Sequence, residues 1–247
     1  MAVDWSGDRR AAHRRIWIAE ARAGELVGLT GGVDRAAATA HVIAAGDVVA
    51  GFDFAFAFPA WFARVLGCVT EDEVWARAAR DGERWLAACD PPFWGRPGRR
   101  RPTRGPAAPE LRATESTLRP WHPKSAFQVG GAGAVGTGSI RGMPHLLELR
   151  RAGFAVWPWD DARAPMALEI YPRALTGPVV KSSAQARAAY LEGDPRVPPA
   201  LLATATASED AFDAAVSALA MAERLPELLA LRASVDPATR LEGAIWR

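Results

Sequence analysis

The sequence predicts an α/β protein: one domain with a mixed sheet of about five strands flanked by helices, and an inserted cap. Two observations indicate this class. Residues 14–19 and 25–29 are strand-like runs joined by a short link containing Gly24, which is typical of a hairpin. A helical pattern over 34–45 and an apolar strand over 48–54 follow, so strands and helices alternate.

Two apolar runs are the expected centre of the sheet. Residues 1–5 and 48–54 are of strand length and apolar on both faces, as buried strands are. Asp4 lies near the end of the first run and Asp53 near the end of the second. An acid at a strand end is usually a turn former or a cap, so neither acid alone indicates catalysis.

The second half of the chain continues the alternation of helices and strands. Helices are expected over 145–152 and 181–192, and strand-like pieces over 155–159 and 167–171. The later of these two pieces places Glu169 among apolar residues. A carboxylate in such a strand is a further candidate for the site.

Residues 60–150 are expected to form an insertion within a single domain spanning 1–247. Residues 61–89 are largely helical in pattern, whereas 90–124 are rich in Pro and Arg and are expected to be a loop. The residues predicted to bind nucleic acid, through phosphate contacts and base stacking, are Trp94, Arg96, Arg99, Arg100, Arg101, Arg104 and Trp121. A solvated loop without a ligand is the alternative.

The segment 128–144 is rich in glycine and contains the spacing GxGxxG from Gly131 to Gly136. That spacing indicates dinucleotide binding only where a helix starts within it. Because Gly142 and Pro144 interrupt the pattern, no helix is expected here. We expect a tight structural crossing, and the alternative is a loop that binds substrate phosphates through backbone N–H groups.

A helix is expected over residues 208–222, with Ser208 as its N-cap and acids in its first turn. Asp210 and Asp213 are three residues apart, so they lie on neighbouring turns of one face. Small residues surround Asp213 and allow the helix to approach a sheet closely. Its carboxylate is therefore expected to be half buried and to need a partner, a proton or a metal.

These acids predict a site. If the strands ending in Asp4 and Asp53 are neighbours and the late helix packs beside them, the carboxylates converge and repel unless a cation lies between them. Oxygen ligands of this kind favour Mg²⁺ or Mn²⁺, and two such ions can hydrolyse phosphodiester bonds. The predicted catalytic residues are Asp4, Asp53, Glu169 and Asp213, and the predicted metal ligands are Asp4, Asp53, Asp210 and Asp213.

Five sequence blocks carry a family resemblance: VDWSG, GFDFAFAFP, EIYPRA, DAFDAAVSALAMA and EGAIW. They resemble blocks of the predicted RNase H-fold nucleases catalogued as domain of unknown function 429. The resemblance runs from Val3 to Trp246 and is weakest in the Arg/Pro-rich part. It implies an RNase H-like fold, with a three-stranded meander, a helix and a further strand followed by more helix and strand units.

The same resemblance implies roles for the acids. Asp4 would be the acid of the first strand, Asp53 that of the fourth strand, and Glu169 an added ligand or an acid that orients the substrate. The DxxDA pattern of Asp210 and Asp213 is similar to the last motif of the Holliday-junction resolvase branch. The implied function is a metal-dependent nuclease. The alternatives are an ATPase or kinase-like protein of the same fold superfamily and a non-catalytic protein that binds nucleic acid.

Bulk composition permits this function. The net charge of +2 and the sequence pI of about 8.8 allow nucleic acid as a partner without demanding it. With two cysteines, Cys68 and Cys89, no disulfide framework is expected, and a cytoplasmic location follows. No apolar stretch has the length of a signal peptide or of a membrane span, so no membrane partner is expected.

Overall fold

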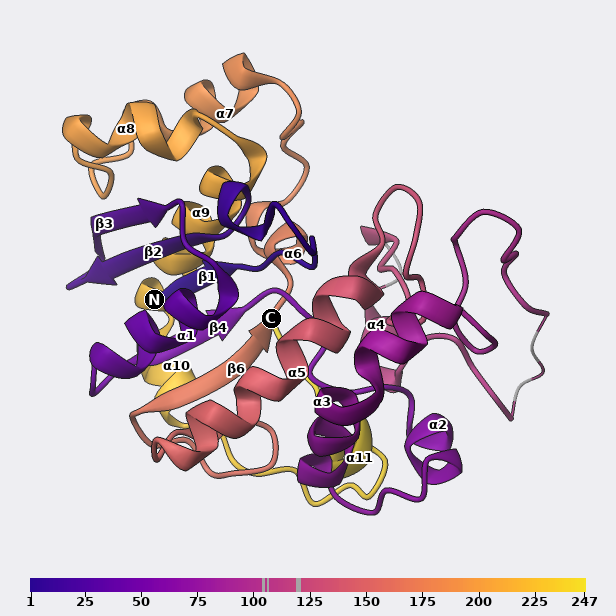
Figure 1. Cartoon of the computed structure of the whole chain (residues 1–247). Coiled ribbons are helices and arrows are strands. Elements are labelled where there is room, and N and C mark those ends of the chain that lie inside the picture. Colours follow the sequence, from indigo (N-terminus) through magenta and orange to yellow (C-terminus); the bar gives the residue numbers. More distant parts are fainter. Residues whose placement is uncertain (104, 106, 119–120) are drawn as a thin grey trace.

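The computed structural model describes residues 1–103, 105, 107–118 and 121–247, and within them a seven-stranded mixed sheet is flanked by helices (Figure 1). The strands are β1 (Ala2–Asp4), β2 (Trp17–Arg22), β3 (Glu25–Gly31), β4 (Val49–Phe52), β5 (Ala155–Val156), β6 (Met166–Ile170) and β7 (Ile245–Trp246). The helices are α1 (Arg35–Ala44), α2 (Ala60–Val65), α3 (Glu71–Ala88), α4 (Ala113–Thr117), α5 (Val135–Arg151), α6 (Pro172–Thr176), α7 (Ala184–Leu191), α8 (Pro199–Thr206), α9 (Glu209–Glu223), α10 (Leu225–Leu229) and α11 (Thr239–Glu242).

The strand order is β3-β2-β1-β4-β6-β5, and β7 also pairs with β6. The pairs β1–β2 and β2–β3 are antiparallel, whereas β1–β4, β4–β6, β5–β6 and β6–β7 are parallel. The predicted mixed α/β class is confirmed, with β1 and β4 adjacent near the centre. The expected number of strands, about five, was too low. The strand β5 lies within the strand-like piece expected over 155–159, whereas β7 was not expected, because its two residues are too few to show an alternating pattern.

The hairpin β2–β3 turns at Ala23 and Gly24, whose φ angles are 50° and 85°. Positive φ at both turn positions matches the right-handed twist of the strands, and glycine adopts it without steric cost. The first hairpin strand begins later than expected, since Ala12–Arg14 form a short 3₁₀ helix before it.

The sheet separates two hydrophobic layers. Val3 and Phe52 belong to the layer with α1, α3 and α5, whereas Ala2 and Leu168 belong to the layer with α9. Figure 1 shows α5 and α1 on one side of the strands and α9 on the other. Because side chains alternate along a strand, this assignment fixes the face of every neighbouring residue.

The part of the glycine-rich segment from Val135 onward is helical, contrary to expectation. Helix α5 begins at Val135 and includes Pro144. A Cβ atom at Gly136 would lie 2.3 Å from the Ala126 carbonyl oxygen, and one at Gly142 would lie 2.6 Å from the ring of Phe54. These glycines, unfavourable for an isolated helix, are required here because they let α5 pack closely against its neighbours.

Candidate functional site

Asp4 and Asp53 are neighbours at the carboxyl edge of the parallel strands. The register pairs Val3 of β1 with Phe52 of β4, so the next residue on each strand is one of the two acids. The Trp5 backbone N–H donates to Asp53 Oδ1 at 2.6 Å. Both acids face the α9 layer, since Val3 and Phe52 face the opposite one.

Helix α9 brings Asp213 to the same place. Ser208 caps the helix, its hydroxyl accepting from the Ala211 N–H at 3.0 Å, as predicted from the sequence. The helix packs on β1 and β2, and Asp213 is only 8% exposed. Asp210, one turn earlier, is half buried.

The pKa values show that these carboxylates interact. Burial raises the pKa of Asp4 well above its usual value, and Asp53, Asp213 and Asp210 raise it further. Burial also raises the pKa of Asp53 to about 7, in spite of the Trp5 hydrogen bond that lowers it. The pKa of Asp213 is raised by burial, against the opposing effect of Lys181. Only acids in one shared environment repel in this way.

Lys181 is a site residue that was not predicted from the sequence. Its ammonium forms an ion pair with Asp213 Oδ2, and its side chain is 19% exposed. It lies in the segment before α7, and the Arg187 guanidinium donates to its backbone carbonyl. One signal was available: the chain has 30 basic residues, and its only lysines are Lys124 and Lys181.

The carboxylate oxygens of the cluster provide some, but not all, of the ligands that a divalent cation requires. Among the described residues, the Asp4 carboxylate has no hydrogen-bond partner, and Asp213 Oδ1 is buried without one. In that same part of the chain, no three Asp, Glu, His or Cys side chains are arranged as a metal-binding group. Mg²⁺ needs only one or two carboxylates when waters and substrate oxygens complete its shell, and Asp4 and Asp53 supply these.

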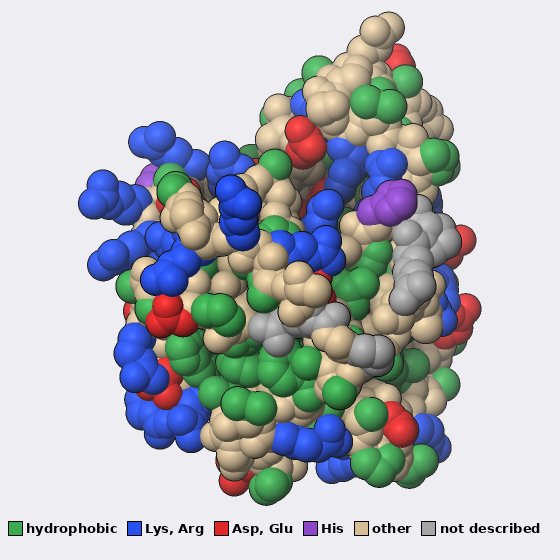
Figure 2. All heavy atoms as spheres, turned by 90° about the vertical axis from the view of Figure 1, so that its right-hand side faces the viewer, with side chains coloured by type: hydrophobic (Ala, Val, Ile, Leu, Met, Phe, Trp, Pro, Cys, Tyr) green, Lys and Arg blue, Asp and Glu red, His purple; other side chains and the backbone are tan. Residues whose placement is uncertain are grey.

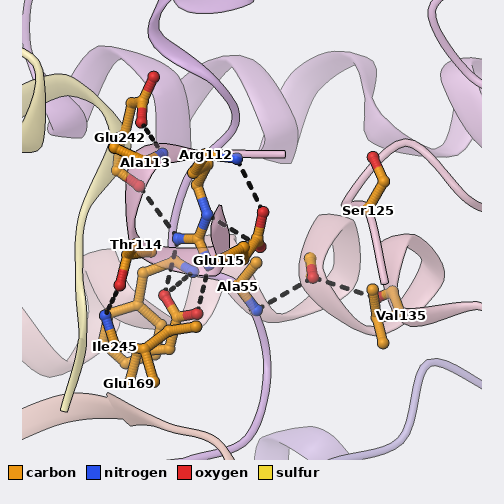
Figure 3. A network of polar contacts seen from close by, with 12 residues as sticks. Ala55, Arg112, Ala113, Thr114, Glu115, Ser125, Val135, Glu169, Glu242 and Ile245 are labelled. Atoms are coloured by element: carbon orange, nitrogen blue, oxygen red, sulfur yellow. Dashed lines mark hydrogen bonds and ion pairs between the residues drawn. The ribbon is translucent and has the colours of Figure 1, made fainter. Parts of the chain in front are cut away.

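Glu169 is not brought to this cluster. It pairs in register with Phe52 and therefore lies on the opposite face of the sheet from Asp4 and Asp53. Its Oε2 accepts from Arg112 Nη1 at 2.8 Å (Figure 3). The same oxygen accepts from the Phe56 N–H at 2.9 Å. These contacts give Glu169 structural partners away from the cluster, where it was expected to be an added ligand or an acid that orients the substrate.

The arginines of the 90–124 loop differ in whether an ion pair within the protein already engages them. Arg101 pairs with Glu110 and lies over the Trp94 ring at 5.5 Å from its centroid, and Arg99 pairs with Asp90 at 3.2 Å. Arg96 and Arg100 are exposed, and no ion pair involves them in the described residues. Arg104 lies outside the described residues. Figure 2 shows many Lys and Arg side chains on the molecular face that carries this loop.

Trp121, also predicted to contact nucleic acid, is 38% exposed. Its carbonyl accepts from the Tyr171 hydroxyl at 3.1 Å. The pKa of Tyr171 is raised chiefly by burial and further by Asp213. This contact places the Trp121 backbone beside Tyr171, a residue whose pKa is affected by the charge of Asp213.

A second basic segment, which the sequence analysis did not single out, follows β1. Arg9, Arg10, Arg14 and Arg15 are all exposed there. Arg15 is near enough to Asp210 to oppose the rise in pKa that burial causes in that acid. The segment therefore adds positive charge next to the cluster.

A cavity of about 1000 Å³ lies at the other end of the strands. Two of its acids are already paired: Glu20 contacts His41 at 3.0 Å, and Glu223 contacts Arg196 at 2.9 Å. In open α/β sheets, ligands bind at the carboxyl ends of the strands. The carboxylate cluster is therefore the better candidate site.

The raised pKa of Asp53 predicts a pH-dependent stability. The unfolded chain loses this proton near pH 3.8, whereas the folded chain keeps it to about pH 7, so stability is lost as the pH rises through that window. Without metal, Asp53→Asn should gain in Tm relative to the parent between about pH 4 and about pH 7. Thermal unfolding of both proteins across this range measures the effect, and a Tm difference independent of pH would contradict it.

The fold and the site define a mixed α/β protein with convergent carboxylates at the carboxyl edge of its parallel strands. No family model, curated protein or solved structure matches the chain. The resemblance to RNase H-fold nucleases is therefore supported by the five sequence blocks alone. Among the described helices, none is long and apolar enough to cross a membrane.

Proposed function

We propose that this protein is a metal-dependent nuclease that hydrolyses phosphodiester bonds, with an RNase H-like arrangement of its sheet. The observation that carries the proposal is the convergence of Asp4, Asp53 and Asp213, from two neighbouring strands and one helix, in a site where burial raises all three pKa values. Keeping such acids together costs stability unless a cation offsets their charge.

Each side chain has a defined part in this proposal. Asp4 and Asp53 hold the cation, and Trp5 fixes the orientation of Asp53 through its N–H. A bound Mg²⁺ or Mn²⁺ would polarise the phosphate and lower the pKa of a bound water. Exposed arginines on both sequence segments, 9–15 and 96–101, bind the phosphate backbone. Glu169 has no part in the reaction.

Cleavage assays test the proposal. DNA and RNA substrates, single-stranded, double-stranded and branched, are incubated with Mg²⁺, Mn²⁺ or a chelator. Metal-dependent cleavage of at least one substrate is expected. Salt-sensitive binding without cleavage under either metal would favour a non-catalytic nucleic-acid-binding protein, and an ATP-induced thermal shift much larger than that with Mn²⁺ would favour the ATPase alternative.

Replacing Arg96 and Arg100 by alanine should weaken nucleic-acid binding for all sequences. Each lost phosphate contact should reduce the slope of log K against log salt by about one unit. Fluorescence anisotropy over a salt series measures both effects. Arg22→Ala and Arg232→Ala are matched controls, since these side chains are 79% and 84% exposed and lie outside both basic segments. An unchanged slope in the double variant would show that these two arginines do not contact phosphates, and would favour the alternative of a solvated loop without a ligand.

A further inference from the structure

The four acids of the cluster differ in the positive side chains that lie near them. Against the effect of burial, Arg15 lowers the pKa of Asp210 more than Lys181 does. Asp210 is also less buried than Asp4, Asp53 and Asp213, which are the inner acids of the cluster. Lys181 lowers the pKa of each of these three, so its ammonium lies within their common field. Lys181 and a single divalent cation together balance three ionised carboxylates.

The contacts divide the cluster into two parts. Asp213 is engaged by Lys181 through Oδ2, in an ion pair whose side chains are 19% and 11% exposed. Asp4 is 8% exposed, and its carboxylate accepts no hydrogen bond from any described group. Asp53 has one oxygen bound by the Trp5 N–H. The available ligand atoms are therefore those of Asp4 and the second oxygen of Asp53. Asp213 Oδ1 is also buried without a partner, but its carboxylate already holds the Lys181 ammonium on Oδ2.

A second divalent cation on Asp213 would meet the Lys181 ammonium. Two cations sharing one carboxylate at contact distance repel strongly in a poorly solvated site. The ammonium would have to leave, and Arg187 holds the backbone of Lys181 in place by donating to its carbonyl. The position of a second ion is thus already taken by a positive side chain.

We propose that this site binds one divalent cation, on Asp4 and Asp53, and that Lys181, held on Asp213, supplies the second positive charge to the scissile phosphate. The proposal rests on the proposed nuclease function, and it replaces the two-ion arrangement expected from the sequence by one ion and one lysine. The ammonium is a compact charge with three donors, and while one holds Asp213 another can bind a non-bridging phosphate oxygen.

The test counts bound Mn²⁺ by electron paramagnetic resonance of the free ion in the parent and in Lys181→Met. The parent should bind one ion per chain. Lys181→Met frees Asp213 and should bind a second ion, while cleavage at low Mn²⁺ falls by about a hundredfold. Cleavage by the variant should then recover with a steeper dependence on Mn²⁺ concentration. Lys124→Met, which changes the other lysine of the chain, should match the parent in both measurements.

Three other outcomes of the ion count would contradict the one-metal proposal or the nuclease proposal. Two ions in the parent would overturn the one-metal site, and one ion in both proteins would overturn the claim that Lys181 occupies the place of a second ion. Both results would leave the nuclease proposal standing. No bound ion in the parent would instead refute the nuclease proposal. Should Lys181→Met not fold, Asp213→Asn replaces it: one ion of parental affinity is expected, and loss of that ion would identify Asp213 as a ligand and overturn the proposal.

Discussion

Asp53→Asn is expected to lower metal-dependent cleavage by at least about a hundredfold, because it removes a charged ligand from the pair that holds the cation. The fold should survive. The Asn side-chain carbonyl can still accept the Trp5 N–H, now bonded at 2.6 Å, and the substitution removes an acid whose pKa is raised to about 7. Single-turnover cleavage rates and circular dichroism, measured on the same preparations, separate these two effects.

Asp210→Asn is the matched control for that experiment. Asp210 belongs to the same cluster but is half buried and faces Arg15, so its loss should reduce cleavage much less. Equal rates for Asp53→Asn and the parent would show that the carboxylate cluster is structural.

Arg112→Met should destabilise the protein by about 3–5 kcal/mol, since it leaves buried carboxylates without their partner. Arg112 is fully buried, and all five of its guanidinium N–H groups have acceptors on Glu115, Glu169 and the Glu242 carbonyl. Burial acts to lower the pKa of Arg112, but Glu115 and Glu169 outweigh it and raise the pKa. The midpoint of urea unfolding measures the loss.

A double variant isolates the cause. Adding Glu169→Gln to Arg112→Met removes one of the stranded charges and should restore part of the lost stability. Arg112→Lys keeps the charge without the two-pronged geometry and should fall between parent and Arg112→Met. A loss within about 0.5 kcal/mol for Arg112→Met would contradict the importance of this network.

Local patterns predicted much of the fold. The hairpin, the capped helices and the central strands were evident because each depends on short-range periodicity or on a capping residue. Ser208 caps α9 as expected. The helix expected over 34–45 is also present, and its first residue, Asp34, caps α1 by accepting from the Ala37 N–H. The closeness of Asp4 and Asp53 was predicted on the condition that their two apolar strands are neighbours, and β1 and β4 do pair.

Contacts between residues far apart in sequence determine the features of the fold and the site that could not be predicted. Glu169 lies in the expected strand, but the face it occupies depends on its register with β4, which no local pattern reveals. The glycines of α5 suit a loop by propensity and a helix only because Ala126 and Phe54 pack against them. Lys181 reaches Asp213 from 32 residues away in sequence, so its role required the tertiary structure.

Calorimetric titration of Mn²⁺ into the parent and into Asp53→Asn tests the central claim, that the convergent carboxylates bind a divalent cation, most directly. The parent should bind Mn²⁺ with a Kd below about 1 mM, and Asp53→Asn should bind it at least about tenfold more weakly, since a ligand charge is lost. Absence of binding by the parent at millimolar Mn²⁺, or equal affinities in the two proteins, would contradict the claim.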